Sequence, residues 1–186
     1  MPVGLCSGGN DAHRFAKADP RVAAAAFLDH YLYATPRSRS IALAQKVSDP
    51  RRIIGFLERK LRELSPAEGE AYAAEESSYF QQPEQGEFCA DIDGFVARGL
   101  PLFFLFTGEY QQVYNYPEQL FEVCPSLREF PACHLHYFPE ADHTFTRAQM
   151  RVQLIALLCR WLREFVLGEA DRTQVVSRPT ASAATT

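Results

Sequence analysis

The stretch LPLFFLFT at residues 100–107 constrains the fold of this chain more than any other segment. It carries no charge, and Gly99 and Gly108 bound it on either side. Apolar residues at nearly every position, rather than at every second one, are typical of a strand that is buried on both faces. Such strands occur in parallel sheets that carry helices on both sides, so this stretch favours an α/β domain.

The rest of the chain alternates between strand-like and helical patterns. Residues 22–29 (VAAAAFLD) and 132–138 (ACHLHYF) predict two more strands, although the alanines of the first also suit a helix. This alternation predicts a mainly parallel α/β sheet with helices on both faces. The predicted helices cover residues 11–17, 36–47, 49–64, 91–98, 117–123 and 146–166, and the last has an apolar face formed by Leu154, Ile155, Leu158, Trp161, Leu162 and Phe165.

Length and composition are those of one globular domain, with 186 residues, 47% hydrophobic and 23% charged. A net charge of -4, without any Lys/Arg run longer than two residues, argues against a nucleic-acid partner. The sequence has no apolar run long enough to span a bilayer and no visible secretory signal, so we expect no membrane association. Five cysteines without a C-x-x-C pair fit a reducing compartment, and we expect a cytoplasmic protein.

The hexapeptide GLCSGG, which starts at Gly4, has the pattern of a reactive turn. A nucleophile elbow reads G-x-nucleophile-x-G and forms a tight turn from a strand into a helix. Gly4 and Gly8 flank Cys6 in this pattern, whereas a nucleophile at Ser7 would place Leu5 where a small residue is needed. The spacing therefore selects Cys6, with the Ser7 amide as an oxyanion donor. The alternative interpretation is a flexible N-terminal tail.

A second motif lies near the other end of the chain. The loop PEADHTF follows strand 132–138 and places His143 just before the last helix. Ligands and catalytic groups gather past the carboxyl ends of parallel strands. Glu109 follows the apolar strand directly after Gly108, so the chain order is nucleophile, acid and histidine. The tyrosine-rich run 110–116 could stack against a substrate, but we expect it to pack within its loop.

Together these motifs resemble the α/β-hydrolase superfamily. GLCSGG resembles the elbow, LPLFFLFTGE the strand that leads to the acid loop, and DHTF the histidine loop. The elbow is similar to that of bacterial serine-aminopeptidase-like and exosortase-associated hydrolases. The resemblance implies a hydrolase domain over residues 1–166 with a helical, lid-like insertion at 36–98. Residues 167–186 are rich in Thr, Ala and Ser, and we expect a disordered tail there.

The resemblance also implies hydrolysis of an ester, thioester or amide of a small acyl substrate by a Cys–His–acid triad, without a cofactor. Cys6 would attack the carbonyl and His143 would take the proton. Glu109 is the preferred acid. Asp29, at the end of strand 22–29, occupies a position that some hydrolases use instead. Asp142 is expected to cap the histidine loop rather than to join the triad.

The beginning of the chain departs from the family pattern. Family members have several strands before the elbow, whereas three residues precede Gly4 here. The chain therefore looks like the C-terminal half of a longer, truncated hydrolase, and we expect little ester turnover from it. Strand 22–29 would be an open edge that a second copy or another partner could cover. A non-catalytic protein that binds a partner along this edge is the alternative function.

The remaining histidines and cysteines give weaker signals. His134 and His136 point to the same face of a strand, which permits metal binding, but the sequence places no further ligand and we expect no metal. Cys89, Cys124 and Cys159 are predicted to be small buried apolar residues.

Overall fold

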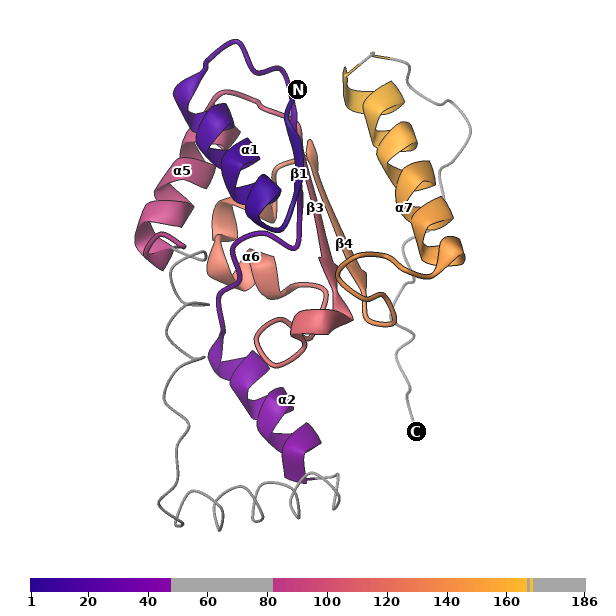
Figure 1. Ribbon diagram of the computed structural model, residues 1–186. Helices are drawn as coiled ribbons and strands as arrows, with labels where there is room; N and C mark the ends of the chain where they lie inside the picture. The colour runs from indigo at the N-terminus through magenta and orange to yellow at the C-terminus, as the bar shows by residue number, and fades with distance from the viewer. Residues whose placement is uncertain (48–81, 167, 169–186) are drawn as a thin grey trace, which may run out of the picture.

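The computed structural model describes residues 1–47, 82–166 and 168, and a four-stranded sheet forms its centre (Figure 1). All three neighbouring strand pairs are parallel, so each connection crosses over a face of the sheet. The predicted α/β class with a parallel sheet is therefore confirmed. In spatial order the strands are β1 (Val3–Leu5), β2 (Ala25–Leu28), β3 (Leu102–Thr107) and β4 (Cys133–Phe138).

Strand β3 is buried on both faces, as the apolar run predicts. All six of its residues are buried. Leu102, Phe104 and Phe106 pack into the core on one side of the sheet. Phe103 and Leu105 pack into a second core on the other side. Because both faces of β3 need cover, this strand fixes the layered architecture.

Helices cover both faces of the sheet (Figure 1). One face carries α1, α5 and α6, and the other carries α7, which continues into one π-helical turn. The bounds are α1 (Ser7–Ala18), α2 (Pro36–Val47), α5 (Gln85–Ala97), α6 (Gln119–Val123) and α7 (Ala148–Trp161), with short turns η1 (Gly108–Tyr110), η2 (Pro125–Leu127) and η3 (Leu162–Val166). Within the described residues, no helix combines the length and apolar character needed to cross a bilayer.

Each predicted helix inside the described residues is present; α2 has the predicted bounds, and the ends of the others are shifted. Helix α5 begins six residues before the predicted start at residue 91, and it packs Phe88, Ile92 and Phe95 into the core beneath the sheet. This part of the expected insertion at 36–98 is therefore the crossover helix between β2 and β3. The predicted helix at 49–64 and residues 169–186 of the expected tail lie outside the described residues.

The strand at residues 22–29 is not an edge strand, contrary to the sequence prediction. It becomes β2 and lies between β1 and β3, with Val3 opposite Ala26. In the described part of the chain β1 forms this edge, and the side chains of Val3 and Leu5 are 50% and 38% exposed. The prediction failed because a three-residue strand at the start of the chain carries almost no periodic signal.

The apolar face of α7 agrees with the predicted one except at Ile155, since Leu154, Leu158, Trp161, Leu162 and Phe165 all belong to the core on this side of the sheet. Trp161 is buried against β3, where its ring lies 5.5 Å from the ring of Phe103. Leu157 packs against this core, whereas Ile155 is 58% exposed. The prediction for Ile155 is therefore wrong, because the position of Trp161 sets the rotation of α7 and leaves Ile155 outside the contact stripe.

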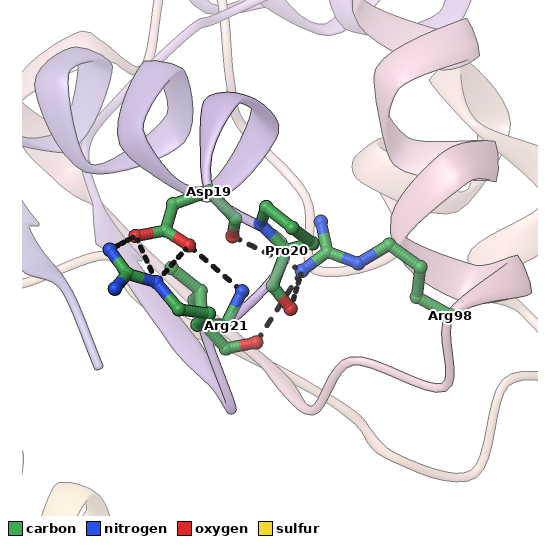
Figure 2. Close-up of polar contacts among 5 residues, drawn as sticks. Asp19, Pro20, Arg21 and Arg98 are labelled. Atoms are coloured by element: carbon green, nitrogen blue, oxygen red, sulfur yellow. Dashed lines mark hydrogen bonds and ion pairs between the residues drawn. The ribbon is translucent and has the colours of Figure 1, made fainter.

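Arg98, just after α5, ties that helix to the chain that leaves α1 (Figure 2). Its guanidinium donates hydrogen bonds to the carbonyl oxygens of Ala16 at 2.9 Å and Pro20 at 3.3 Å. In the same turn the Arg21 guanidinium donates hydrogen bonds to both carboxylate oxygens of Asp19, the shortest at 2.7 Å. The last carbonyls of a helix lack partners within the helix, so Arg98 satisfies groups that would otherwise need water.

We expect Arg98→Ala to lower the free energy of unfolding by about 1–2 kcal/mol, because it removes several charge-assisted hydrogen bonds at a partly exposed site. Urea denaturation measures this change. Arg128→Ala is the matched control, since the Arg128 guanidinium contacts the Phe121 ring at 5.8 Å and has no side-chain hydrogen bond within the described residues. Equal stability of the two variants would contradict a structural role for Arg98.

Candidate active site

The carboxyl ends of the four strands bring the candidate catalytic residues to one edge of the sheet. Cys6 follows β1, Asp29 follows β2, and Glu109 and Tyr110 follow β3. His143 lies on the loop between β4 and α7. Parallel strands all end at the same edge, which is where α/β proteins place their binding and catalytic groups.

Cys6 occupies a tight turn between β1 and α1. Its backbone has φ 56° and ψ -122°, a conformation that is costly for a residue with a side chain. Its N–H donates to the carbonyl oxygen of Leu28 at 2.8 Å, and its own carbonyl accepts the N–H of Gly9 at 2.8 Å. The strand–turn–helix geometry that the elbow pattern predicts is thus present, with Cys6 at its apex.

The glycines around Cys6 do not play equal parts. A Cβ atom on Gly4 would overlap the backbone of Gly8, so only glycine fits at position 4. A Cβ atom on Gly9 would lie 2.7 Å from the Cβ of His30. Gly8 itself has open space around its Cβ position. The interpretation that the turn needs a small side chain at Gly8 is therefore wrong, because the close neighbour of Gly4 is the main chain of Gly8.

Helix α1 directs its N-terminus at the turn. Ser7 is the first helical residue, and the first N–H groups of a helix have no partner within the helix. The first turn of α1 contains no acidic residue that would neutralise its positive end. The Ser7 amide can therefore donate a hydrogen bond to an anion that forms beside Cys6.

Asp29 is the carboxylate that pairs with His143. Its Oδ2 lies 3.1 Å from His143 Nδ1. Thr107 donates to the same carboxylate twice, from its N–H to Oδ1 at 2.7 Å and from its hydroxyl to Oδ2 at 2.6 Å. The Asp29 side chain is 1% exposed and that of His143 is 22% exposed. With Nδ1 held by the buried carboxylate, Nε2 on the far side of the ring remains available to exchange a proton.

Glu109, the acid preferred from the sequence, is exposed on η1. The reason lies in the strand order, which the sequence did not reveal. Because β2 is an interior strand, the residue that directly follows it sits beside Thr107 at the end of β3. The structure therefore pairs His143 with Asp29, the alternative carboxylate.

Asp142 caps its own loop. Its carboxylate accepts the hydroxyls of Thr146 at 2.6 Å and Thr144 at 2.9 Å, together with the backbone N–H groups of both residues. These hydrogen bonds hold the pKa of Asp142 well below its usual range. As expected, Asp142 caps the histidine loop.

Tyr110 contacts both Cys6 and His143, a role that the sequence did not indicate. Its ring meets the His143 ring edge-on, at 5.4 Å between centroids. Burial raises the pKa of Tyr110, as do the nearby charges of Cys6 and Asp29 and a hydrogen bond with the Cys6 side chain. Tyr110 therefore stays protonated and can donate its hydroxyl hydrogen. Its sequence signals were its place next to Glu109 and its membership of the tyrosine-rich run 110–116, which was expected to pack within its own loop.

His134 and His136 pack beneath α7 instead of facing this site. The His134 ring lies 4.5 Å from the ring of Phe165, and the His136 ring lies 5.1 Å from the ring of Phe103. Burial lowers the pKa of both histidines, that of His136 to about 4. Among the residues that the structure describes, no group of three or more His, Cys, Asp or Glu side chains could hold a metal ion.

A scan against protein-family models finds no match, and searches of curated proteins and of solved structures find none either. The residues and geometry of this chain are therefore the basis for its function.

Proposed function

We propose that this chain transfers acyl groups to water, with Cys6 as the nucleophile, His143 as the general base and Asp29 as the residue that orients His143. One observation carries the proposal. A cysteine with φ 56° at the start of a helix lies at the same sheet edge as a His–Asp pair with an N–O distance of 3.1 Å. A nucleophile at a strained turn, a base and an orienting acid are the parts that nucleophilic catalysis needs.

In this mechanism the Cys6 thiol gives its proton to His143 Nε2, and the sulfur attacks the carbonyl carbon of the substrate. The oxyanion of the tetrahedral intermediate accepts hydrogen bonds from the Ser7 amide and the Tyr110 hydroxyl. When the intermediate collapses, the C–O, C–S or C–N bond breaks and His143 protonates the leaving group. Water, activated by His143, then hydrolyses the thioester and regenerates Cys6.

The proposed substrates are small acyl esters, thioesters or amides. Each step moves a proton or forms and breaks a bond at one carbonyl carbon, so the cycle needs no cofactor. Tyr110 contributes an aromatic ring beside His143, which suits an apolar acyl chain or leaving group.

An activated ester tests the proposal without knowledge of the natural substrate. Incubation with p-nitrophenyl acetate should release about one equivalent of p-nitrophenolate quickly, since acyl-enzymes accumulate when the second step is slow. Mass spectrometry after acid quench should find the acetyl group on the tryptic peptide that contains Cys6. Absence of both the burst and the acetylated peptide would rule out the proposed reaction.

The identity of the acid is tested by a pair of carboxylate variants. We expect Asp29→Asn to slow acylation by about 10- to 100-fold, because an amide no longer stabilises the imidazolium of His143. Glu109→Gln should acylate at the wild-type rate. Stopped-flow release of p-nitrophenolate measures both, and the melting temperature is recorded because Asp29 also accepts two hydrogen bonds from Thr107. A larger effect of Glu109→Gln would reverse the assignment.

Partner binding at the sheet edge is the second candidate function. The exposure of Val3 and Leu5 on β1, the outer strand of the described sheet, favours it, since an edge strand with apolar side chains can support strand addition. Sedimentation of the wild type beside Val3→Lys distinguishes the two candidates. A self-association that the lysine abolishes, without any acylation of Cys6, would favour binding over catalysis.

A further inference from the structure

Two cysteines remote from Cys6 in the sequence lie in direct contact beneath the sheet. Cys89 is on α5, and Cys124 follows the last residue of α6. Their Sγ atoms are 2.6 Å apart, and the Cys89 thiol also lies 3.0 Å from the carbonyl oxygen of Val123. Both thiols are free, whereas Cys159, which the sequence predicted to be buried, is exposed on α7.

The distance between the two sulfur atoms is close to that in a disulfide bond. A disulfide needs a separation of about 2 Å between its sulfurs and Cβ atoms that approach each other. The two sulfurs already face one another, so a shift of about half an ångström in the side chains closes the bond. The surrounding backbone belongs to a shared core that includes Phe88, Val123 and Leu127.

The two thiols differ in how they can be reached. Cys89 is half-buried, whereas Cys124 is fully buried. Burial, followed by the hydrogen bond with Cys89, raises the pKa of the Cys124 thiol. An external reagent therefore meets Cys89 first, and Cys124 reacts as the internal partner.

We propose that Cys89 and Cys124 form an oxidisable dithiol that a small-molecule disulfide converts into an intramolecular disulfide. In the first step the Cys89 thiol loses its proton and its sulfur attacks one sulfur of oxidised glutathione. This forms a mixed disulfide and releases one glutathione thiolate. Cys124 then loses its proton and attacks Cys89 Sγ, which releases the second glutathione. The two cysteines are oxidised by two electrons, and one oxidised glutathione is reduced to two glutathione molecules.

The new bond would join α5 to Cys124, directly after α6. Residues 89–124 include β3, Thr107 and Tyr110, so the bond closes a loop around the centre of the fold. Closing a loop of this length restricts the unfolded chain and should raise the melting temperature by about 5–10 °C. The inference is independent of the proposed acyl transfer, because Cys6 takes no part in it.

Peptide mapping tests the pairing directly. The full chain is treated with oxidised glutathione, its remaining thiols are blocked with N-ethylmaleimide under denaturing conditions, and it is cut with trypsin. Cleavage after Arg98 separates a peptide at 63–98 that contains Cys89 from one at 99–128 that contains Cys124. We expect these two peptides to be linked and to separate again with dithiothreitol. Both peptides fully blocked with N-ethylmaleimide, or linked to glutathione alone, would overturn the proposal.

Two variants provide the controls. Cys124→Ser should abolish the link and the rise in melting temperature, whereas Cys159→Ser should keep both. If Cys124→Ser does not fold, comparison of the oxidised and reduced wild type decides the question by the linked peptide and the melting temperature. Equal melting temperatures of the linked and reduced wild type would contradict the stabilising role.

Discussion

Replacing Cys6 with alanine is expected to slow the initial burst of p-nitrophenolate release from p-nitrophenyl acetate by at least about 1,000-fold, because the nucleophile and the covalent intermediate are both lost. Cys159→Ala is the matched control, since Cys159 is exposed on α7, on the face of the sheet away from α1. Initial rates of p-nitrophenolate release measure both variants. Similar loss in the two, or full activity of Cys6→Ala, would contradict the assignment of Cys6.

Replacing Cys6 with glycine distinguishes an effect on catalysis from an effect on folding. The backbone of Cys6 has φ 56°, which glycine adopts without strain. Cys6→Gly should therefore be as inactive as Cys6→Ala, yet it should melt at a higher temperature than the alanine variant. An inactive variant that is better folded would exclude general unfolding as the cause of the lost activity.

Gly4→Ala is expected to destabilise this protein strongly. The new Cβ would overlap the backbone of Gly8, where no flexible side chain can move aside. Either β1 or the start of α1 must shift, and we expect a loss of at least about 3 kcal/mol in the free energy of unfolding. Urea denaturation followed by circular dichroism measures this loss.

Gly8→Ala is the control for the same chemical change four residues later. Gly8 lies within α1 and has open space at its Cβ position, and alanine is the better helix former. We expect this variant to be neutral or more stable by up to about 1 kcal/mol. A destabilisation as large as that of Gly4→Ala would mean that the two glycines are equivalent after all, as their symmetric spacing around Cys6 suggested.

Much of the fold could be predicted because its signals are local. The apolar run at 100–107 is long enough to show that β3 is buried on both faces. The α/β class followed from the alternation of such runs with helical patterns, and the structure confirms it. The sequence did not predict where β1 lies in the sheet. Its three residues carry no periodicity, and they pair with β2, which is distant in the sequence.

The candidate site was predictable in part. The positions of Cys6 and His143 at the sheet edge followed from local motifs, each read within a few residues of a strand end. Local motifs did not predict which carboxylate pairs with His143. Glu109 and Asp29 both follow strands, and their distance from His143 depends on the order in which those strands pair.

The sequence by itself determined the strand β3, the α/β layering and the glycine-bounded turn at Cys6, because each depends on residues that are neighbours in the chain. Only the tertiary structure decided that Asp29 pairs with His143, that Tyr110 meets Cys6 and that Cys89 touches Cys124. These contacts join residues that are 114, 104 and 35 positions apart (143 - 29, 110 - 6 and 124 - 89). Strand order and helix rotation set such distances, and both are fixed by the packing of the whole core.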